Sequence, residues 1–319
     1  MADKFFVAHA PHMRKNESIT GIMWRVNLAL IPAGLVALFI FGPSALWVVA
    51  SSVLAAVGTE ALIQKTRGQR VTVYDGSAFM TGLLLAYNLP AHCPVWVAAA
   101  GSIFAIAIAK QAFGGLGRNI FNPALAGRAF LMAAWPKYMT TFTKPFIYDA
   151  VTQATPLSLI KEGKASGVVD LGLSYWDLLI GNRGGALGEV CILALLLGGV
   201  YLLYKGIISW HIPVSYVVTV AVFMWAFGSP DGFGRGDALF QVLSGGLVLG
   251  AFFMATDYVT SPVTKKGQVI FGVCCGLLTG IIRRWGGYPE GVCYSILIMN
   301  AAAPLIDRFV QKRRYGATR

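Results

Sequence analysis

The sequence has few charged residues. Asp, Glu, Lys and Arg make up 13% of its 319 residues, about half the share found in a soluble globular protein. Hydrophobic residues make up 56%, and the mean hydropathy is +0.64. This composition excludes a disordered chain, a disulfide-rich secreted scaffold and an ordinary cytosolic enzyme. Because long apolar runs recur along the chain, the sequence predicts an all-α membrane protein that crosses the bilayer many times.

The signatures of soluble enzymes and of metal sites are missing too. There is no GxxxxGK[ST], HExxH or GxSxG segment, and the five cysteines form no CxxC pair. The four histidines are too scattered to suggest a metal site. Gly115-Leu-Gly117 lacks a third glycine and a surrounding βαβ unit, so we do not expect a dinucleotide-binding fold. We therefore assign no catalytic residue and no metal ligand from the sequence.

About ten apolar segments are candidates for membrane spans, although some are shorter than the roughly 20 residues that a full crossing needs. They fall into two groups of five, and the hydrophilic stretch 136–183 separates the groups. In chain order the segments are 19–41, 44–64, 77–89, 95–113, 122–135, 187–208, 214–227, 238–258, 269–282 and 292–310.

Basic residues gather on one side of the predicted membrane. Lys and Arg clusters lie before the first span and after the second, eighth and tenth, whereas the connections 42–43 and 88–94 carry none. Positive residues favour the cytoplasmic side, so we expect segments 1–17 and 311–319 in the cytoplasm and 136–183 outside it. The net charge of +12 then marks cytoplasmic loops rather than nucleic-acid binding. Arg283 and Arg284 fall on the opposite side and disagree with this orientation.

The two halves, 18–135 and 184–310, share their Gly and Pro positions. In each half a short apolar segment ends near a proline, Pro90 or Pro262, and a span follows it. A Gly-Gly pair then begins at Gly114 or Gly286, 24 residues after the proline in both halves. Five spans per half would place these matching features on opposite sides of the membrane, which is typical of inverted repeats with a site near the midplane. The alternative is chance, because Gly and Pro are common in membrane helices.

Polar residues inside the predicted membrane are the main candidates for a site, because they are costly there unless they have partners. The segment 114–128 is too rich in glycine and polar residues to face lipid. Gly115 permits a close approach to a planar ligand, Asn119 and Asn122 offer both donors and acceptors, and Arg118 and Arg128 could hold anionic groups. The alternative is a tight re-entrant turn whose side chains cap backbone groups.

Four other polar residues lie within or near the predicted spans. Asp257 and Asn300 in the second half are candidates of the same kind as the asparagines of the first half. Glu60 and Lys110 lie nearer the ends of their spans, where we expect their side chains to reach toward water.

The central stretch contains Asp149-Ala-Val-Thr152-Gln-Ala-Thr155, which precedes Pro156. From its residues alone it is an exposed, turn-forming segment in which Thr155 favours extended backbone. The segment resembles the flavinylation motif D-[GA]-x-[ST]-x-A-[ST] of the membrane subunits of the Rnf complex and of Na⁺-translocating NADH:quinone reductase. This resemblance implies that Thr155 is esterified, through its side-chain oxygen, to the phosphate of FMN by an extracytoplasmic flavin transferase.

The resemblance extends over essentially the whole chain. Pro11-His-Met-Arg14 is similar to the opening of the RnfD branch of the NqrB/RnfD family, and a long N-terminal region typical of the other branch is absent. Gly117-Arg-Asn-Ile-Phe-Asn-Pro-Ala124 resembles a segment that lies near a second, non-covalent flavin, seen as riboflavin in a relative. The resemblance thus implies Asn119, Asn122, Arg118 and Gly115 as contacts of a second flavin. It also implies ten helices in two inverted five-helix repeats, similar to urea transporters.

By this resemblance the chain is one component of an ion-translocating oxidoreductase in a bacterial or archaeal cytoplasmic membrane. Its partners would be Fe–S, flavin and membrane subunits of an Rnf complex, the flavin transferase and membrane lipid. The complex would couple ferredoxin and NAD oxidoreduction to Na⁺ or H⁺ movement, and the chain alone would be inactive. Two alternatives stay open: a stand-alone channel or transporter for a small polar solute, and a purely structural membrane anchor. Neither has a use for the motif at 149–155.

Overall fold

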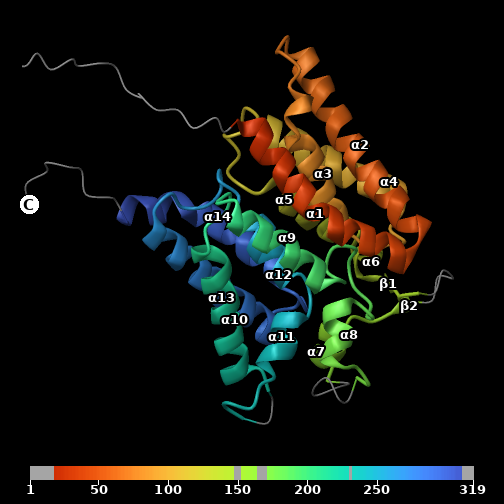
Figure 1. Cartoon of the computed structure of the whole chain (residues 1–319), viewed down its shortest axis with the longest axis vertical. Coiled ribbons are helices and arrows are strands. Elements are labelled where there is room, and N and C mark those ends of the chain that lie inside the picture. Colours follow the sequence, from red (N-terminus) through yellow and green to blue (C-terminus); the bar gives the residue numbers. More distant parts are fainter. Residues whose placement is uncertain (1–17, 147–151, 164–170, 230–231, 311–319) are drawn as a thin grey trace, which may run out of the picture.

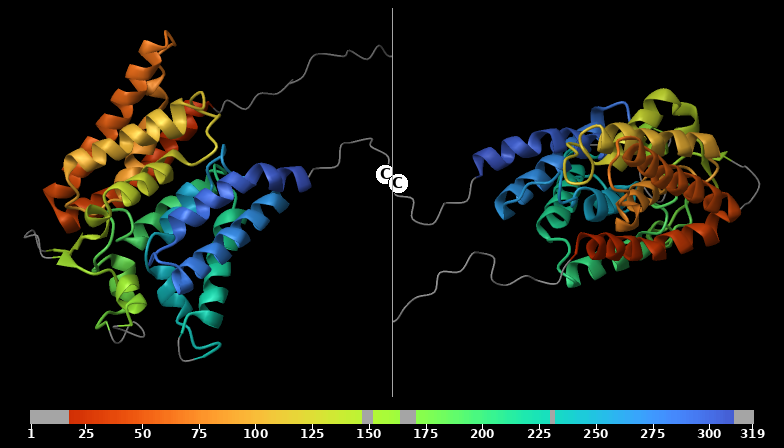
Figure 2. Two further views of the ribbon diagram at one scale, coloured as in Figure 1. Left: turned by 180° about the vertical axis from the view of Figure 1, so that it is seen from behind. Right: turned by 90° about the horizontal axis from the view of Figure 1, so that it is seen from above.

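The structure, a computed structural model, describes residues 18–146, 152–163, 171–229 and 232–310. Within these ranges the chain is almost entirely helical, and the first and second halves form two adjacent groups of helices (Figures 1 and 2). The short elements between the halves lie at the right and lower right of the view in Figure 1. The terminal segments 1–17 and 311–319 lie outside the described residues.

The first half begins with a pair of long helices that are joined by a tight turn. Gly42, at φ 70°, forms the turn between α1 and α2, and the side chain of Ser18 caps the start of α1. A broken helix, a full-length helix and a second short helix follow. The elements are α1 (Ile19–Phe41), α2 (Pro43–Thr66), η1 (Val73–Asp75), α3 (Ser77–Tyr87), α4 (Val95–Phe104) continued by the π-helical η2 (Ala105–Gln111), and α5 (Pro123–Ala134).

Short elements connect the halves, and the second half then follows the same order of long and broken helices. The connecting elements are α6 (Pro136–Thr140), β1 (Phe142–Thr143), β2 (Thr152–Gln153), α7 (Pro156–Lys161) and α8 (Tyr175–Ile180), and the two strands pair antiparallel. The second half contains α9 (Ile192–Tyr204), α10 (His211–Phe227), α11 (Ala238–Leu243), α12 (Leu247–Leu249), the π-helical η3 (Gly250–Met254), α13 (Lys265–Trp285) and α14 (Val292–Phe309).

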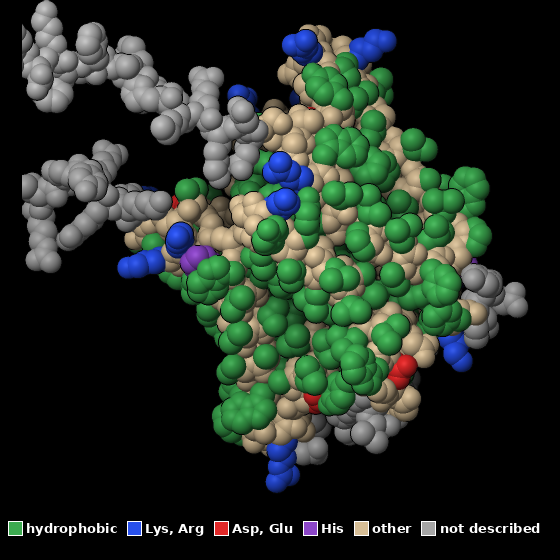
Figure 3. All heavy atoms as spheres, in the orientation of Figure 1, with side chains coloured by type: hydrophobic (Ala, Val, Ile, Leu, Met, Phe, Trp, Pro, Cys, Tyr) green, Lys and Arg blue, Asp and Glu red, His purple; other side chains and the backbone are tan. Residues whose placement is uncertain are grey.

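Four of these helices, α1, α2, α13 and α14, are long and apolar enough to cross a membrane. Five further helices or helix pairs of 10–17 residues are also apolar. The surface over α1, α2 and α10 is covered mainly by hydrophobic side chains, with Lys and Arg at the extremities (Figure 3). The prediction of an all-α membrane protein is therefore confirmed. The predicted span 238–258 is interrupted, because α11, α12 and η3 divide it.

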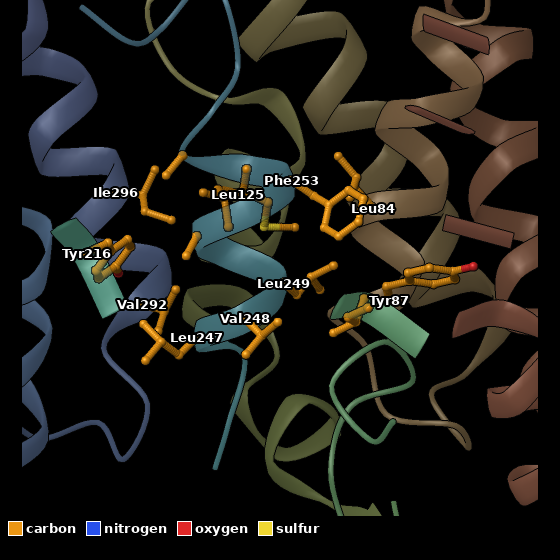
Figure 4. Close-up of a cluster of buried hydrophobic side chains, with 14 of the residues drawn as sticks. Leu84, Tyr87, Leu125, Tyr216, Leu247, Val248, Leu249, Phe253, Val292 and Ile296 are labelled. Atoms are coloured by element: carbon orange, nitrogen blue, oxygen red, sulfur yellow. The ribbon is translucent and has the colours of Figure 1, made fainter. Parts of the chain in front are cut away.

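The apolar core joins the two halves. Leu84 and Leu125 from the first half lie in one cluster with Leu249 and Phe253 from the second (Figure 4). Helix α1 packs on α9, and the close approach requires a glycine: a Cβ on Gly198 would lie 2.1 Å from the carbonyl oxygen of Ala29. This packing fixes the loop before α9 against the end of α3, where the candidate site is found.

Candidate functional site

Thr155 is the N-cap of α7. Its backbone is extended, at φ −70° and ψ 151°, as the following proline favours. Its Oγ1 accepts a hydrogen bond from the backbone N–H of Ser158 at 3.2 Å and donates one to the Ser158 hydroxyl at 3.1 Å. The side chain is 7% exposed. The prediction of an exposed segment is thus wrong at Thr155, because the N-cap position turns its side chain inward; Asp149, Ala150 and Val151 lie outside the described residues.

Helix α7 is held against the end of α13. The Lys161 ammonium group donates hydrogen bonds to three backbone carbonyls, those of Ile282, Arg283 and Tyr288, at 3.1, 3.3 and 2.8 Å. Burial of this amine lowers its pKa. Because these bonds connect the central stretch to the second half, they fix the position of Thr155.

Thr155 borders a hollow of about 60 Å³ between α5, β1 and α14. One end of the hollow is polar, with Arg128 and Glu290. The rest is lined by sulfur-containing and aromatic side chains, and the rings of Tyr288 and Tyr294 stack at 4.8 Å. The apolar lining consists of Ala129, Met132, Met139, Phe142, Tyr288, Pro289, Cys293 and Tyr294.

Beside the hollow lies a cluster of buried charges from both halves. Arg128 of α5 forms ion pairs with Glu189, at 3.4 Å, and with Glu290. It also donates to the Oδ1 of Asn88, just beyond α3, at 2.6 Å. The sequence predicts that Arg128 holds anionic groups. In this structure its guanidinium pairs with two carboxylates of the chain itself, those of Glu189 and Glu290.

Two further arginines complete the cluster. Arg183, in the loop before α9, donates to the carbonyl oxygen of Glu189 at 2.9 Å. Arg283, near the end of α13, donates to the carbonyl oxygens of Gln241, Ser244 and Glu290. Arg283 is 5% exposed, so its position reflects internal hydrogen bonding and not the loop charge that sets orientation.

A second polar group lies at the start of α5. The carbonyl oxygen of the Asn122 side chain caps α5 through Ala124 and Leu125, and its amide donates to the carbonyl of Met254 at 3.2 Å. The Asn300 side chain accepts from the backbone N–H of Asn122 at 3.1 Å. Asn122 lines a cavity of about 50 Å³ together with Asp257. The structure thus brings Asn122, Asn300 and Asp257 together from both halves.

Of the remaining predicted contacts, Asn119 lies beside Asp257 of this cavity, whereas Gly115 and Arg118 are not among its lining residues. Asn119 is buried and donates to the carbonyl of Phe121 at 3.0 Å. Gly115 is buried and faces the side chain of Gln111, whereas Arg118 is exposed. Thr155 borders a different hollow, so the predicted site residues do not form a single site.

Glu60 and Lys110 do not reach toward water, and that prediction is wrong. Both are buried and form an ion pair at 2.8 Å. The Lys110 amine also donates to the Ser77 hydroxyl at 2.7 Å, and the amide of Gln111 donates to Glu60 at 2.9 Å. The π-helical turn η2 carries Lys110 and Gln111, and both are buried. The pair therefore ties α2 to η2 and to the start of α3.

Sequence reasoning missed Arg183, Glu189 and Glu290 as members of a site. Arg183 and Glu290 stand next to glycines in connections between predicted spans, and Glu189 follows Gly188 at the start of the predicted span 187–208. A charged residue in a glycine-rich connection, at the edge of an apolar run, was the signal that could have found them. Among the described residues, no group of three or more His, Cys, Asp or Glu is placed to hold a metal ion.

The chain has apolar helices, and the loops between them bury ionised side chains. These features define a polytopic membrane protein with a polar site inside it. The chain belongs to the NQR2, RnfD, RnfE family, whose sequence model matches residues 6–316. The resemblance inferred from the sequence is confirmed.

Relatives match the chain over nearly its full length, and each is the D component of its complex. The chain is 52% identical to that of the Na(+)-translocating ferredoxin:NAD(+) oxidoreductase complex of Acetobacterium woodii, over 98% of this chain and 96% of that protein. It is 50% identical to that of the proton-translocating ferredoxin:NAD(+) oxidoreductase complex of Clostridium ljungdahlii, over 99% and 97%. It is 38% identical to that of the ion-translocating oxidoreductase complex of Stutzerimonas stutzeri, over 94% and 92%.

Proposed function

We propose that the chain is the D component of an ion-translocating ferredoxin:NAD⁺ oxidoreductase complex and carries FMN covalently on Thr155. The names of the relatives support the first part. The second part rests on one observation above all: Thr155 borders a hollow with a polar end and an aromatic lining. The chain would act only with the other subunits of the complex, in a cytoplasmic membrane, with movement of Na⁺ or H⁺.

The residues around Thr155 fit a phosphate-linked flavin. Tyr288, Tyr294 and Phe142 offer surfaces on which a planar ring can stack. A flavin attached at Thr155 would rest its ring against these side chains. A bound flavin supplies the redox chemistry of the site, while the chain supplies attachment, orientation and charge.

Attachment requires one bond to form and one to break. The Thr155 Oγ1 loses its hydroxyl proton and bonds to phosphorus, so the donor must carry FMN through a pyrophosphate bond that breaks and releases a nucleoside monophosphate. The esterified oxygen can still accept the hydrogen bond from the Ser158 N–H, but it no longer donates to the Ser158 hydroxyl. The cap of α7 therefore survives attachment.

The architecture we propose is two inverted five-helix repeats. In the first half α2 packs on α3 and α4, and in the second half α10 packs on α11 and α13. Helices α5 and α14 meet through Asn122 and Asn300, and α1 meets α9. With cytoplasmic termini, this arrangement puts Thr155 on the outer side, where a flavin transferase could reach the chain before it takes its final fold.

The test is to co-express the full chain with a flavin transferase and to record in-gel flavin fluorescence and intact mass. We expect a fluorescent band with a single FMN increment in the wild type and in Thr152→Val, and no increment in Thr155→Val. Fluorescence retained in Thr155→Val would move the attachment site, with Thr152, the other hydroxyl of the motif, as the next candidate. A dark wild-type band beside a labelled positive control would favour the solute transporter instead.

A second, non-covalent flavin near Asn119 and Asn122 is a separate proposal. The Asn122 amide already has partners, and the adjacent cavity holds about 50 Å³, so a flavin could bind only after the start of α5 moves. Flavin released by denaturation should fall in Asn122→Ala while the covalent band stays unchanged. Equal release from the two proteins would leave Asn122 with its capping role alone.

A further inference from the structure

Among the described residues, donors of Arg183, Gly184 and Gly185 in the loop before α9 have no acceptor. The Nε of Arg183 is buried and unpaired, although the Nη2 of the same side chain is bonded to the carbonyl of Glu189. The backbone N–H groups of Gly184 and Gly185, both buried residues, likewise have no partner within the described part of the chain. Buried N–H groups without an acceptor are rare in native proteins.

These donors belong to residues that line one small cavity. Arg183, Gly184 and Gly185 line it together with Thr155 and Pro156. Its volume is about 10 Å³, roughly the volume needed to hold one water-sized atom. The cavity can therefore take one oxygen atom of a group that is itself attached at Thr155.

The charge of the surrounding cluster also calls for an anion. Arg128, Arg183 and Arg283 are buried with only two carboxylates, Glu189 and Glu290. Three guanidinium groups against two carboxylates leave an excess of one positive charge, which is costly in a buried site.

We propose that Arg183, with the backbone N–H groups of Gly184 and Gly185, binds an oxygen of the phosphoryl group that is attached at Thr155. This inference rests on the proposed function, which puts a phosphodiester of FMN on that residue. A phosphodiester carries one negative charge, so it offsets the excess charge of the cluster. Successive backbone N–H groups and an arginine are the usual donors for such an anion. The two carboxylates at the cavity, Glu189 and Glu290, both pair with Arg128.

The phosphoryl group and the flavin ring would then lie on different sides of Thr155. The phosphoryl oxygen lies on the side of Arg183 and Gly185, and the ring lies on the side of Tyr288 and Tyr294. Two points of attachment, one covalent and one ionic, fix the direction in which the flavin leaves Thr155. Arg183 is thus a positioning residue: it acts on the phosphate and leaves the redox chemistry to the ring.

The test uses ³¹P NMR of the full, flavinylated chain in detergent, with the denatured protein as reference. In the wild type, the phosphodiester resonance should be displaced from its denatured position. Arg183→Met should lose most of that displacement, whereas Arg183→Lys should keep part of it because the charge remains. Arg25→Met, which removes an exposed arginine elsewhere, should match the wild type.

Gly185 provides a matched pair that leaves Arg183 in place. Its φ is not positive, and an added Cβ would come no closer than 3.6 Å to any atom, at Val190. Gly185→Pro removes the N–H donor and should reduce the displacement, whereas Gly185→Ala keeps the donor and should not. A wild-type resonance in both Arg183→Met and Gly185→Pro, with covalent flavin present, would overturn the proposal. A wild type without covalent flavin would instead contradict the proposed function.

Discussion

The ion pair between Glu60 and Lys110 gives the sharpest test of the fold. Lys110→Met would leave the Glu60 carboxylate buried, with only the amides of Gln111, at 2.9 Å, and Gln64, at 3.4 Å. Removing one partner of a buried pair typically costs about 3–5 kcal/mol. The two remaining amide donors place the expected loss near the lower end, about 3 kcal/mol. The Ser77 hydroxyl adds little, because it keeps its bond to Asp75 at 2.7 Å.

Glu60→Gln with Lys110→Met should be far milder than Lys110→Met alone. The double variant buries no unpaired charge, and replacing a whole buried pair by neutral groups is often close to neutral. We expect a loss of about 1 kcal/mol, and hence a favourable coupling of about 2 kcal/mol or more between the two sites. Lys65 is exposed and lies in the last turn of α2. The variant Lys65→Met therefore controls for the loss of one positive charge.

The assay is the free energy of unfolding in mixed detergent micelles, with the helical circular dichroism signal followed against the fraction of SDS. Wild type, both single variants, the double variant and Lys65→Met would be compared in one lipid and salt condition. A Lys110→Met protein as stable as Lys65→Met would refute the reasoning. A double variant whose loss equals the sum of the two single losses would refute it equally, because the two side chains would then act independently.

Three further predictions use the same unfolding assay. Asn122→Ala removes the cap of α5 and the bond to Met254, so we expect a loss of about 2 kcal/mol, and an unchanged midpoint would contradict the cap. Gly198→Val forces side-chain atoms toward the carbonyl of Ala29 and should cost about 3 kcal/mol; wild-type stability would mean that α1 and α9 do not meet this closely. Tyr216→Phe removes hydroxyl bonds to Thr279 and Ser295. Those two hydroxyls remain bonded to each other at 2.7 Å, so the loss should be about 1 kcal/mol, and a loss several times larger would show that the hydroxyl network acts as a unit.

The long helices were predictable because they depend on local sequence. The apolar run 19–41 forms α1 with the same ends, since Ser18 caps its start and Gly42 ends it. The predicted span 269–282 is too short at both ends. Helix α13 begins at Lys265, after the cap residue Thr264, and extends to Trp285. Apolarity alone misses these ends, because the charged residues at each end of α13 continue the helix.

The polar sites were harder to predict, because their partners lie far apart in the chain. Arg128 contacts Glu189, 61 residues away, and Glu290, 162 residues away. No local pattern indicates such a contact. Thr155 was found only through a motif, and its buried N-cap role depends on the docking of α7 by Lys161. Sequence pattern thus indicated the candidate atom, and tertiary packing determines its surroundings.

Arg283 shows how a failed rule can indicate a site. By the distribution of positive charge, Arg283 and Arg284 fall on the wrong side of the membrane. In the structure Arg283 is buried and its guanidinium donates to three backbone carbonyls. A charge that is fixed inside the protein does not contribute to loop charge, so it should be left out of the count that sets orientation. The same cost of burial explains why such a residue persists only where it serves a site. A basic residue that contradicts an otherwise consistent topology is therefore a candidate for a buried polar cluster, as it is here beside Glu290.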